Sequence, residues 1–240
     1  MKYIEDRSSV INPLADYEDL LKSKKKLRVK LGVDPTAPDV TLGWYAILRA
    51  LRKFQEYGHT AVLILGEFTA QVGDPSGKSA ERDFLSEDTL RANQIGIQLQ
   101  LEKFLEFHGG SNSAELVNNY DWFKEFSFLG FLREAGKFLT VNYMMSKYSF
   151  KKRLETGISF TEFSYQLLQG YDFYHLYKTK NVRLQMGGSD QWGNIINGID
   201  LIRKILNQKA YALTSPLITN ADGSKMGKTA KGAVWLDSNK

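Results

Sequence analysis

The stretch from Arg28 to Trp44, RVKLGVDPTAPDVTLGW, constrains the fold more than any other part of the chain. Its β-branched beginning, Arg28–Val33, predicts a short buried strand. Two prolines and several turn-forming residues then break regular structure, and from Thr41 apolar residues recur at helical spacing. Such a strand–loop–helix unit points backbone N–H groups and the positive end of the helix at one place. This predicts an anion site suited to nucleotide phosphates, although an ordinary strand-to-helix connection gives the same pattern.

Apolar runs and helical periodicities alternate along the rest of the chain. The patterns predict strands at 61–65, 182–186 and 217–219, a strand or turn at 118–122, and helices at 11–26, 86–107, 161–178 and from the loop after 186 to Leu206. Ser86 is expected to cap its helix, with two acids following in the first turn. The alternation predicts an α/β fold, a Rossmann-like doubly wound parallel sheet. The aromatic-rich segment 123–148 is expected to be helical and to pack in the core or to form an oligomer interface.

Composition narrows the classes of function. The 240 residues include no cysteine, which excludes disulfides, thiol catalysis and cysteine-based zinc sites. The three histidines are scattered, so no metal site is predicted. No apolar run approaches the roughly 20 residues that span a bilayer, and the N-terminus does not resemble a secretory signal. These features predict a cytoplasmic protein without a membrane partner. The lysine-rich segment 22–30 is interpreted as a solvated helix end rather than an RNA-binding patch.

The predicted helix 161–178 carries an unusual polar stripe. Tyr165, Gln169 and Asp172 are spaced by four and three residues, so they share one helix face. A phenol, an amide and a carboxylate differ from the lysines and glutamates of a typical solvent face. The stripe therefore predicts contacts with a small ligand that has an ammonium group at one end and a hydroxyl at the other.

The loop at 66–79 contains Gly77-Lys78-Ser79, which is similar to the end of a phosphate-binding P-loop. The first glycine of that motif would fall at position 72, which is Val72. We therefore reject a P-loop kinase.

Four motifs, in this order, carry a resemblance to tyrosyl-tRNA synthetases of the class I aminoacyl-tRNA synthetases. They are GVDPTAPD with TLGW, GDPSGK, GGSDQWGN and KMGKT, and the resemblance extends from about residue 28 to 237. The first signature normally ends in His-x-Gly-His, whereas this chain has Thr41-Leu42-Gly43-Trp44. Both signature histidines are thus replaced.

The resemblance implies a role for each matching residue. The substrate-binding residues would be Asp74, Tyr165 and Gln169 at the amino group, Asp172 at the phenol, Gln185 and Gln191 near the carboxyl group, and Lys30, where many bacterial enzymes have a substrate-contacting tyrosine. The ATP-binding residues would be Asp34, Gly43, Trp44, Gly188, Asp190 and Lys228. The residues that assist catalysis would be Thr36, Thr41, Lys78, Arg82, Lys225, Lys228 and Thr229. A buried acceptor for the phenol rejects phenylalanine by a factor on the order of 10⁵, the value known for tyrosyl-tRNA synthetases themselves and not one derived from this sequence.

The implied activity is activation of L-tyrosine by ATP, assisted by Mg²⁺, followed by charging of tRNA-Tyr in a homodimer. The implied organisation is a single catalytic domain with a first half at 1–95, a helical insertion at 96–160 between the halves, and a second half at 161–240 that ends near KMGKT, without an anticodon-binding domain. Loss of both histidines predicts slow or absent activation. The alternative is an inert tyrosine- or RNA-binding protein on the same fold, or an engineered chimera, because residues 27–95 and the part from NNYDWF onward resemble different bacterial subfamilies.

Overall fold

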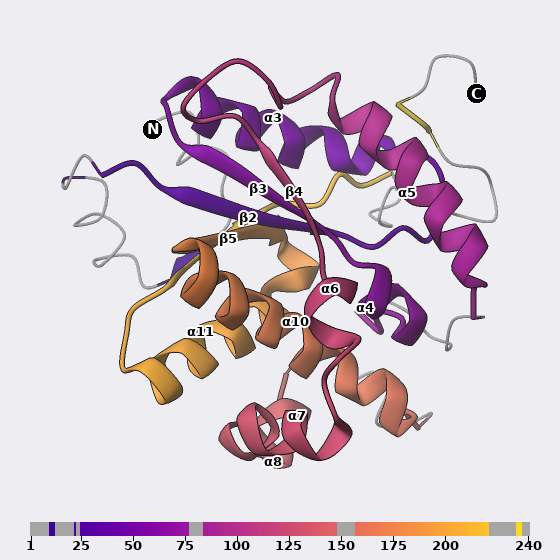
Figure 1. Cartoon of the computed structure of the whole chain (residues 1–240), viewed down its shortest axis with the longest axis vertical. Coiled ribbons are helices and arrows are strands. Elements are labelled where there is room, and N and C mark those ends of the chain that lie inside the picture. The colour runs from indigo at the N-terminus through magenta and orange to yellow at the C-terminus, as the bar shows by residue number, and fades with distance from the viewer. Residues whose placement is uncertain are drawn as a thin grey trace.

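A six-stranded sheet forms the centre of the molecule, as the computed structural model in Figure 1 shows. The structure describes residues 10–12, 22, 25–76, 84–147, 157–220 and 234–236. The strands are β1 (Val10–Asn12), β2 (Arg28–Val33), β3 (Thr60–Leu65), β4 (Glu115–Asn118), β5 (Leu184–Gly188) and β6 (Tyr211–Ser215). Their order is β1-β6-β5-β2-β3-β4, with parallel pairing from β6 to β4 and antiparallel pairing of β1 with β6. The order reverses beside β2, which is where such sheets bind ligands.

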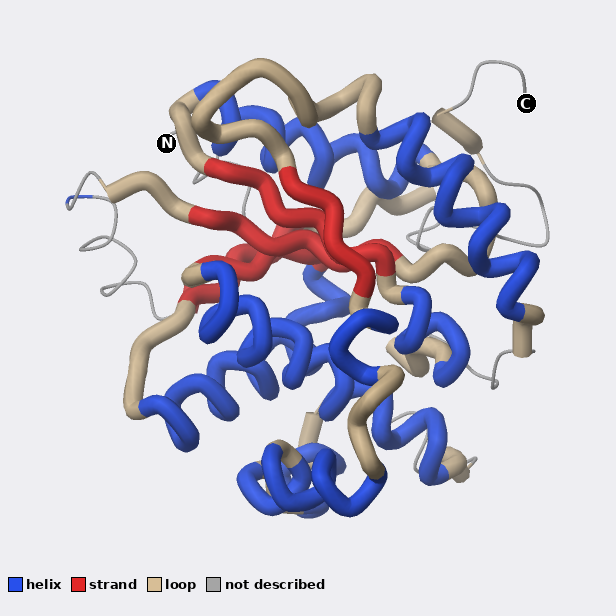
Figure 2. The backbone as a smooth tube through the Cα atoms, viewed as in Figure 1, coloured by secondary structure: helices blue, strands red, loops and turns tan. Residues whose placement is uncertain are grey.

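Helices cover both faces of the sheet (Figures 1 and 2). The longer helices are α3 (Leu42–Glu56), α5 (Glu87–Leu101), α10 (Phe160–Lys180) and α11 (Trp192–Leu206). The shorter ones are α4 (Glu67–Val72), α6 (Tyr120–Phe123), α7 (Phe128–Glu134), α8 (Val141–Met145) and the 3₁₀ turns η1 (Gly136–Phe138) and η2 (Ser189–Gln191). The predicted α/β fold with a doubly wound, largely parallel sheet is confirmed.

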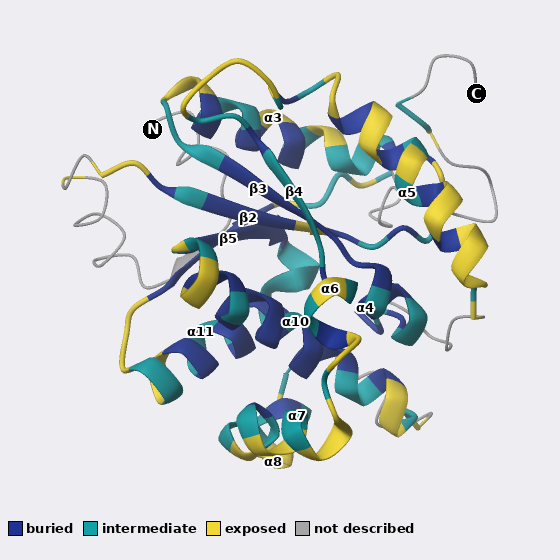
Figure 3. Cartoon of the chain, viewed as in Figure 1, coloured by how far each residue is buried: buried dark blue, intermediate teal, exposed yellow. Residues whose placement is uncertain are grey.

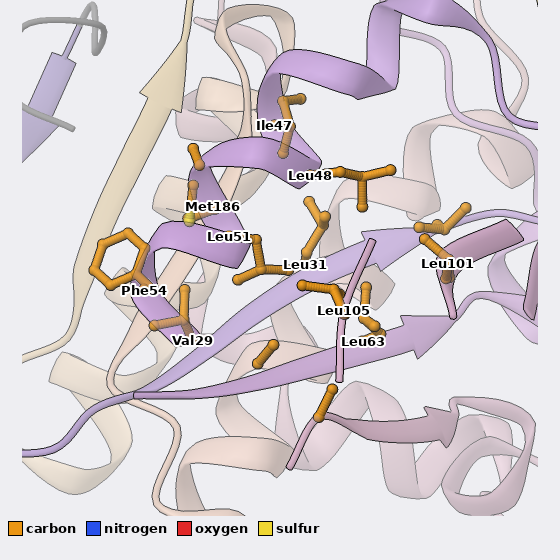
Figure 4. Packing of buried hydrophobic residues seen from close by; sticks show 14 of the residues in the cluster. Val29, Leu31, Ile47, Leu48, Leu51, Phe54, Leu63, Leu101, Leu105 and Met186 are labelled. Carbon is orange, nitrogen blue, oxygen red and sulfur yellow. The ribbon is translucent and has the colours of Figure 1, made fainter. Parts of the chain in front are cut away.

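Strand alternation divides the hydrophobic core between the two faces. Val29, Leu31 and Leu63 point towards α3 and α5, where they pack against Leu48 and Phe54 (Figure 4). The intervening residues of β3 pack on the other side, with α10 and α11. Figure 3 shows the buried residues concentrated along the sheet and on the helix faces turned towards it. The same alternation directs Lys30 of β2 away from the first cluster.

Helices α10 and α11 pack closely through two glycines. A Cβ atom built on Gly170 would lie 3.2 Å from the backbone nitrogen of Gly198, which is tighter than most such contacts. The absence of both side chains lets the helix backbones approach each other. This contact fixes the helix that carries the predicted polar stripe.

Several sequence-based expectations are wrong or shifted. The helix predicted at 11–26 is wrong at its start, where the β-branched Val10 and Ile11 pair with β6 in β1. Residues 13–21, 23 and 24 of that prediction lie outside the described residues. The strand predicted at 217–219 lies earlier, at Tyr211–Ser215, where Pro216 ends it for lack of an N–H donor. Strand β5 is shifted to Leu184–Gly188, and α5 ends at Leu101.

Other expectations are confirmed. Ser86 caps α5 by accepting a hydrogen bond from the Thr89 backbone N–H, and Ala61–Leu65 lies within β3. The segment 118–122 combines the end of β4 with the start of α6. The predicted helical insertion at 96–160 is not helical throughout, because it contains strand β4, which belongs to the sheet. Helices α7 and α8, which also lie in this range, stand apart from the sheet in Figure 1. The division of the chain at residues 95 and 160 stays a prediction.

Candidate active site

A cavity of about 420 Å³ lies where β2, β3 and β5 end and α3 begins, beside α10. Every described candidate residue lines this cavity: Lys30, Asp34, Thr36, Thr41, Gly43, Trp44, Asp74, Tyr165, Gln169, Asp172, Gln185, Gly188, Asp190 and Gln191. They come from four separate parts of the chain, 30–44, 74, 165–172 and 185–191. The remaining candidates, Lys78, Arg82, Lys225, Lys228 and Thr229, lie outside the described residues.

Helix α10 contributes the polar stripe that its sequence predicted. Ser159 caps the helix by accepting from the Glu162 backbone N–H, and the regular spacing then places Tyr165, Gln169 and Asp172 along the cavity wall. The apolar residues between them, including Leu168, are buried in the core on the other side. The predicted face is therefore confirmed, and it is a cavity wall rather than a solvent face.

Asp172 lies at one end of the cavity and is 3% exposed. One of its carboxylate oxygens accepts from the Trp122 indole Nε1 at 3.0 Å, and the other accepts from the Asn119 amide at 3.3 Å. Burial raises the pKa of Asp172 to about 6, whereas the nearby Lys30 and these two donors act to lower it. Asn119 and Trp122 were not predicted from the sequence. One sequence feature could have identified them. They follow directly after the strand β4, and the ligand-binding loops of such a sheet meet at the carboxyl ends of its strands.

Lys30 lies beside this end of the cavity and is 1% exposed. Its ammonium donates to Gln185 Oε1 at 3.3 Å and to the Gln169 carbonyl oxygen at 3.5 Å. Burial lowers the pKa of Lys30 to about 8, and the charges of Asp172 and Asp34 oppose that shift. The interpretation of the segment 22–30 as a solvated helix end is therefore wrong for Lys30, because strand alternation turns this side chain into the cavity.

A second carboxylate, Asp34, ties the first signature loop to α10. It accepts from the Tyr165 hydroxyl at 2.7 Å and from the Thr69 hydroxyl at 2.9 Å. Gly66 permits this arrangement, since a Cβ atom there would collide with both the Asp34 carboxylate and the Thr69 hydroxyl. Burial, followed by the charges of Asp34 and Asp74, raises the pKa of Tyr165 well above its ordinary value, so the phenol stays a neutral donor.

The third carboxylate, Asp74, lies in an amide network contributed by α10, η2 and α11. It accepts from Gln191 Nε2 at 2.7 Å and from the Ser76 backbone N–H at 2.9 Å. Asn194 donates to Gln169 Oε1 at 3.0 Å and thereby joins this network to the polar stripe. Asn194 is another residue of the site that its sequence position alone did not predict. The sequence feature that could have identified Asn194 is its place as the last residue of the GGSDQWGN motif.

The loop between β2 and α3 is held by side chains of α5. Asn93 donates to the Pro35 carbonyl oxygen at 2.9 Å, and Gln100 donates to Asp39 at 2.8 Å. Thr41 is the N-cap residue of α3, but its side chain makes no capping hydrogen bond. The Trp44 indole lines the cavity and also packs against the core cluster of α3 and α5. Both residues that replace the signature histidines thus face the cavity.

The chain near its C-terminal end returns to this loop. The Leu42 backbone N–H donates to the Val234 carbonyl oxygen at 2.7 Å, and the Leu236 N–H donates to the Val40 carbonyl oxygen at 2.9 Å. On the other side of KMGKT, Leu217 and Ile218 line the cavity. Leu217 and Ile218, before the motif, therefore line the cavity, and Val234 and Leu236, after it, bond to the loop that contains the lining residues Val40 and Thr41.

The charges of the described lining are mostly negative. Asp34, Asp39, Asp74, Asp172 and Asp190 contribute carboxylates, and Lys30 is the one cationic side chain among the described lining residues. Such a wall favours a cationic group of a ligand, such as an ammonium, over a phosphate. Among the described residues, no cluster of three or more histidine, cysteine or acidic side chains could hold a metal ion. None of the helices in the described part of the chain combines the length and apolar content needed to cross a membrane.

Comparison with known proteins agrees with this arrangement. The family model "tRNA synthetases class I (W and Y)" matches residues 22–240. The tyrosine–tRNA ligase of Cytophaga hutchinsonii is 61% identical over 92% of this chain and 51% of that protein. The tyrosine–tRNA ligase of Bacteroides fragilis strain ATCC 25285 is 55% identical over 99% of this chain and 57% of that protein. The chain thus spans about half the length of the curated relatives it matches.

Solved structures show the same fold. A C-terminally truncated mitochondrial tyrosyl-tRNA synthetase from Coccidioides posadasii superposes with a TM-score of 0.82 at 29% identity, covering 99% of this chain and 70% of that one. The tyrosyl-tRNA synthetase of Archaeoglobus fulgidus, solved with L-tyrosine, has a TM-score of 0.71 at 18% identity and supports the fold alone.

Proposed function

Since the chain belongs to the class I tRNA synthetases of the W and Y group, we propose that it activates tyrosine with ATP. In this reaction the tyrosine carboxylate attacks the α-phosphorus of ATP, forming tyrosyl-adenylate and releasing pyrophosphate. The tyrosyl group is then transferred to tRNA-Tyr, with release of AMP. None of these steps requires a covalent bond to the protein, so the chain would act by positioning and by stabilising phosphate charge.

The observation that carries the proposal is the polar stripe of α10 inside the cavity. Asp172 would accept the hydrogen bond of the phenol at the buried end. Tyr165, Gln169 and Asp74 would hold the ammonium group, which suits the negative charge of the lining. In this pose the carboxyl group points towards Gln191 and the β2–α3 loop.

ATP would occupy the side of the cavity formed by the start of α3 and the loop after β5. Gly188 and Asp190 would contact the ribose, and Gly43 and Trp44 the adenine side. The phosphates need cations that the described lining does not supply, and Lys78, Arg82, Lys225 and Lys228 are the candidates. Thr36, Thr41 and Thr229 would contribute further polar contacts to ATP, whereas Gln185, like Gln191, would lie near the carboxyl group of tyrosine. We expect Mg²⁺ to enter with the phosphates of ATP, to which it would lend charge.

The replaced histidines lower the expected rate of activation rather than tyrosine affinity. Each lost donor to a developing phosphate charge reduces the rate by a factor of about 10²–10³. Thr41 keeps a short hydroxyl, whereas Trp44 places a large indole beside the cavity. Tyrosine-dependent ATP–pyrophosphate exchange tests this, with the chain as it stands compared with the double variant Thr41→His/Trp44→His.

We expect slow exchange by the chain itself and faster exchange by the double variant. Calorimetry should show similar tyrosine affinities for the two proteins, because no hydrogen bond among the described residues joins the Thr41 or Trp44 side chain to the residues proposed to bind tyrosine. Absence of exchange from both proteins, at saturating tyrosine and ATP, would contradict the proposed activity and favour a binding protein on this fold.

A homodimer is part of the proposal. Five large apolar side chains are exposed on α7, α8 and the first residue of α10: Phe128, Leu129, Leu132, Val141 and Phe160. Phe128 and Phe160 are each 67% exposed, and several exposed apolar side chains on neighbouring helices, unlike a single exposed phenylalanine, are typical of an interface. Phe126, Phe131 and Phe138 of the same aromatic segment pack against the core instead.

Action on tRNA would place the protein in the cytoplasm.

Light scattering tests the dimer directly. We expect the mass of two chains for the parent and of one chain for Phe128→Glu/Phe160→Glu, whereas Phe84→Glu, at an exposed phenylalanine before α5, should leave the dimer intact. A monomeric parent at micromolar concentration would contradict the proposal.

A further inference from the structure

Strand β4 is the last strand of the sheet and pairs with β3 along one edge only. The Asn119 backbone N–H, at the end of the strand, donates to the Leu65 carbonyl oxygen at 3.1 Å. Because bonding residues alternate along a strand, Leu116 and Asn118 direct their backbone N–H and C=O groups away from β3. Within the described part of the chain, no hydrogen bond uses these four groups. The edge therefore offers two donors and two acceptors to a further strand.

A groove of about 580 Å³ follows this free edge. Helix α5 contributes to its wall on one face of the sheet, and the C-terminal end of α10 forms its wall on the other face. Figure 1 shows these two helices on opposite sides of the sheet. We call it the β4 groove, and the lining residues used below are Leu116, Val117, Asp121, Trp122, His175 and Thr179.

The two walls of the β4 groove differ in chemistry. On the α10 side, Val117 joins the core cluster of α10 and α11, and the rings of Trp122 and His175 stack with their centroids 4.6 Å apart. On the α5 side, the amide of Gln94 lies beside Leu116. A strand placed beside β4 would alternate its side chains between these walls. An apolar side chain suits the α10 wall, and a small polar one suits the α5 wall.

The two ends of the β4 groove differ in charge. Asp121, at the carboxyl end of β4, is exposed, and no ion pair among the described residues includes it. At the other end, the Lys180 ammonium is already paired with Glu115 at 3.0 Å. A basic side chain of a ligand is therefore favoured at the carboxyl end of β4.

We propose that the β4 groove is a docking site for an extended peptide segment of a partner protein, which adds to the sheet as a strand beside β4. An apolar residue of the segment lies against the Trp122–His175 stack, and a basic residue lies beside Asp121. Four residues of such a strand span about 13 Å, the length of β4 itself. This site is separate from the cavity that would bind tyrosine.

The backbone groups of β4 favour a peptide over other occupants. A small aromatic molecule would stack on the rings but leave the groups of Leu116 and Asn118 unused. A second copy of this chain does not match the groove, because its own β4 lies between the same two helices and is recessed in the same way. A single extended segment reaches the edge and uses its donors and acceptors.

Fluorescence anisotropy with two labelled hexapeptides tests the site. Lys-Val-Thr-Val-Thr-Val places its lysine beside Asp121 when it runs antiparallel to β4, and Val-Thr-Val-Thr-Val-Lys does so when it runs parallel. We expect one of the two to bind. N-methylation of two adjacent central residues keeps every side chain but removes an N–H that faces β4. This change should weaken binding by about 10-fold or more.

Variants of the protein locate the bound peptide. Thr179→Trp fills the β4 groove from an exposed position of α10 and should weaken peptide binding at least about 10-fold. Thr161→Trp makes the same change at an exposed position at the other end of α10 and should leave binding unchanged. Asp121→Asn should weaken binding by about two- to fivefold, as expected for a partly solvated ion pair.

Hydrogen exchange on the unmodified chain examines the edge without any variant. The backbone N–H groups of Leu116 and Asn118 should exchange faster than those of Val117 and Asn119, and the bound peptide should slow the first two. Equal protection of all four groups without peptide would show that a second copy covers the edge and would overturn the proposal.

The peptide measurements give three further results that would overturn it. These are failure of both peptides to bind at up to about 1 mM, equal binding of the N-methylated peptide, and equal binding to the folded Thr179→Trp protein. None of these measurements uses tyrosine or ATP, so their outcome is distinct from that of the proposed function.

Discussion

Replacing Asp172 by asparagine should remove tyrosine recognition while preserving the shape of the site. In the structure this carboxylate accepts hydrogen bonds from Trp122 and Asn119 and lines the cavity with further acceptor capacity. An asparagine side chain has one acceptor oxygen, and its NH₂ group would face another donor. If the oxygen stays with Trp122, then the amide meets the Asn119 amide donor to donor, and the phenol of the ligand loses its charged acceptor.

The magnitude follows from the lost hydrogen bond. A hydrogen bond to a charged group contributes about 1.5–3 kcal/mol, which corresponds to roughly a 10- to 150-fold weaker binding of tyrosine. Asp172→Asn also removes the negative charge that opposes the lowered pKa of Lys30, so a larger fraction of that lysine becomes neutral near pH 7. Phenylalanine has no hydroxyl to lose, and its affinity should change little. The selectivity for tyrosine should therefore fall by nearly the full factor, and Asp172→Ala should abolish measurable tyrosine binding.

Isothermal titration calorimetry with both amino acids at pH 7 measures this directly. Asp121→Asn is the matched control, because it makes the same change at an exposed position of the neighbouring helix α6. Thermal unfolding of each variant reports whether the fold is kept. Undiminished tyrosine affinity in a folded Asp172→Asn or Asp172→Ala protein would refute the assignment of the hydroxyl end of the pocket.

Three further predictions concern the stability of the site. Tyr165→Phe removes the hydroxyl that donates to Asp34 at 2.7 Å and should lower the free energy of unfolding by about 1–3 kcal/mol in urea titrations; an unchanged midpoint would contradict this. Ser86→Ala removes the α5 cap and should cost about 1 kcal/mol without changing tyrosine affinity, a pairing that calorimetry and urea titration check together. The pKa of Lys30 is about 8 when folded and about 10.5 when unfolded, so the unfolded chain binds more protons in that window and stability should rise with pH across it, by up to roughly 3 kcal/mol. Measuring the unfolding free energy of the parent and of Lys30→Met at pH 7.5 and at pH 9.5 isolates the contribution of Lys30. If the difference between the two proteins is the same at both pH values, then the lowered pKa of Lys30 is contradicted.

Local signals predicted most of the framework. The apolar run Ala61–Leu65, the cap at Ser86 and the spacing of Tyr165, Gln169 and Asp172 each depend on interactions within a few residues, and the structure keeps all of them. The family resemblance added candidate site residues from distant parts of the chain, and no local pattern shows that these residues lie together. The structure brings those described positions into one cavity because the carboxyl ends of β2, β3 and β5 meet beside the reversal of strand order.

The errors arose where non-local contacts decide the outcome. Residues Val10–Asn12 form a strand because they pair with β6, whose residues lie about 200 positions later in the sequence. Lys30 looked like part of a basic surface segment because its neighbours in sequence are exposed lysines. Its environment is set by α10, which lies on the β2 face that carries it, and by the neighbouring strand β5. Asn119 and Trp122 were missed for the same reason, since their partner Asp172 lies about 50 residues further along the chain.

The geometry separates the residues proposed to recognise tyrosine from those proposed to act in its activation. Lys30, Asp172 and Tyr165 come from β2 and α10, and their contacts with Gln185, Trp122 and Asp34 do not involve Thr41 or Trp44. The two replaced histidine positions lie instead at the start of α3, which is held by α5 and by the segment Val234–Leu236. A change at Thr41 or Trp44 can therefore alter the rate of adenylate formation without disturbing the amino-acid pocket. It follows that tyrosine affinity and pyrophosphate exchange should respond to different substitutions, so a chain that binds tyrosine yet exchanges slowly is the outcome that this arrangement favours.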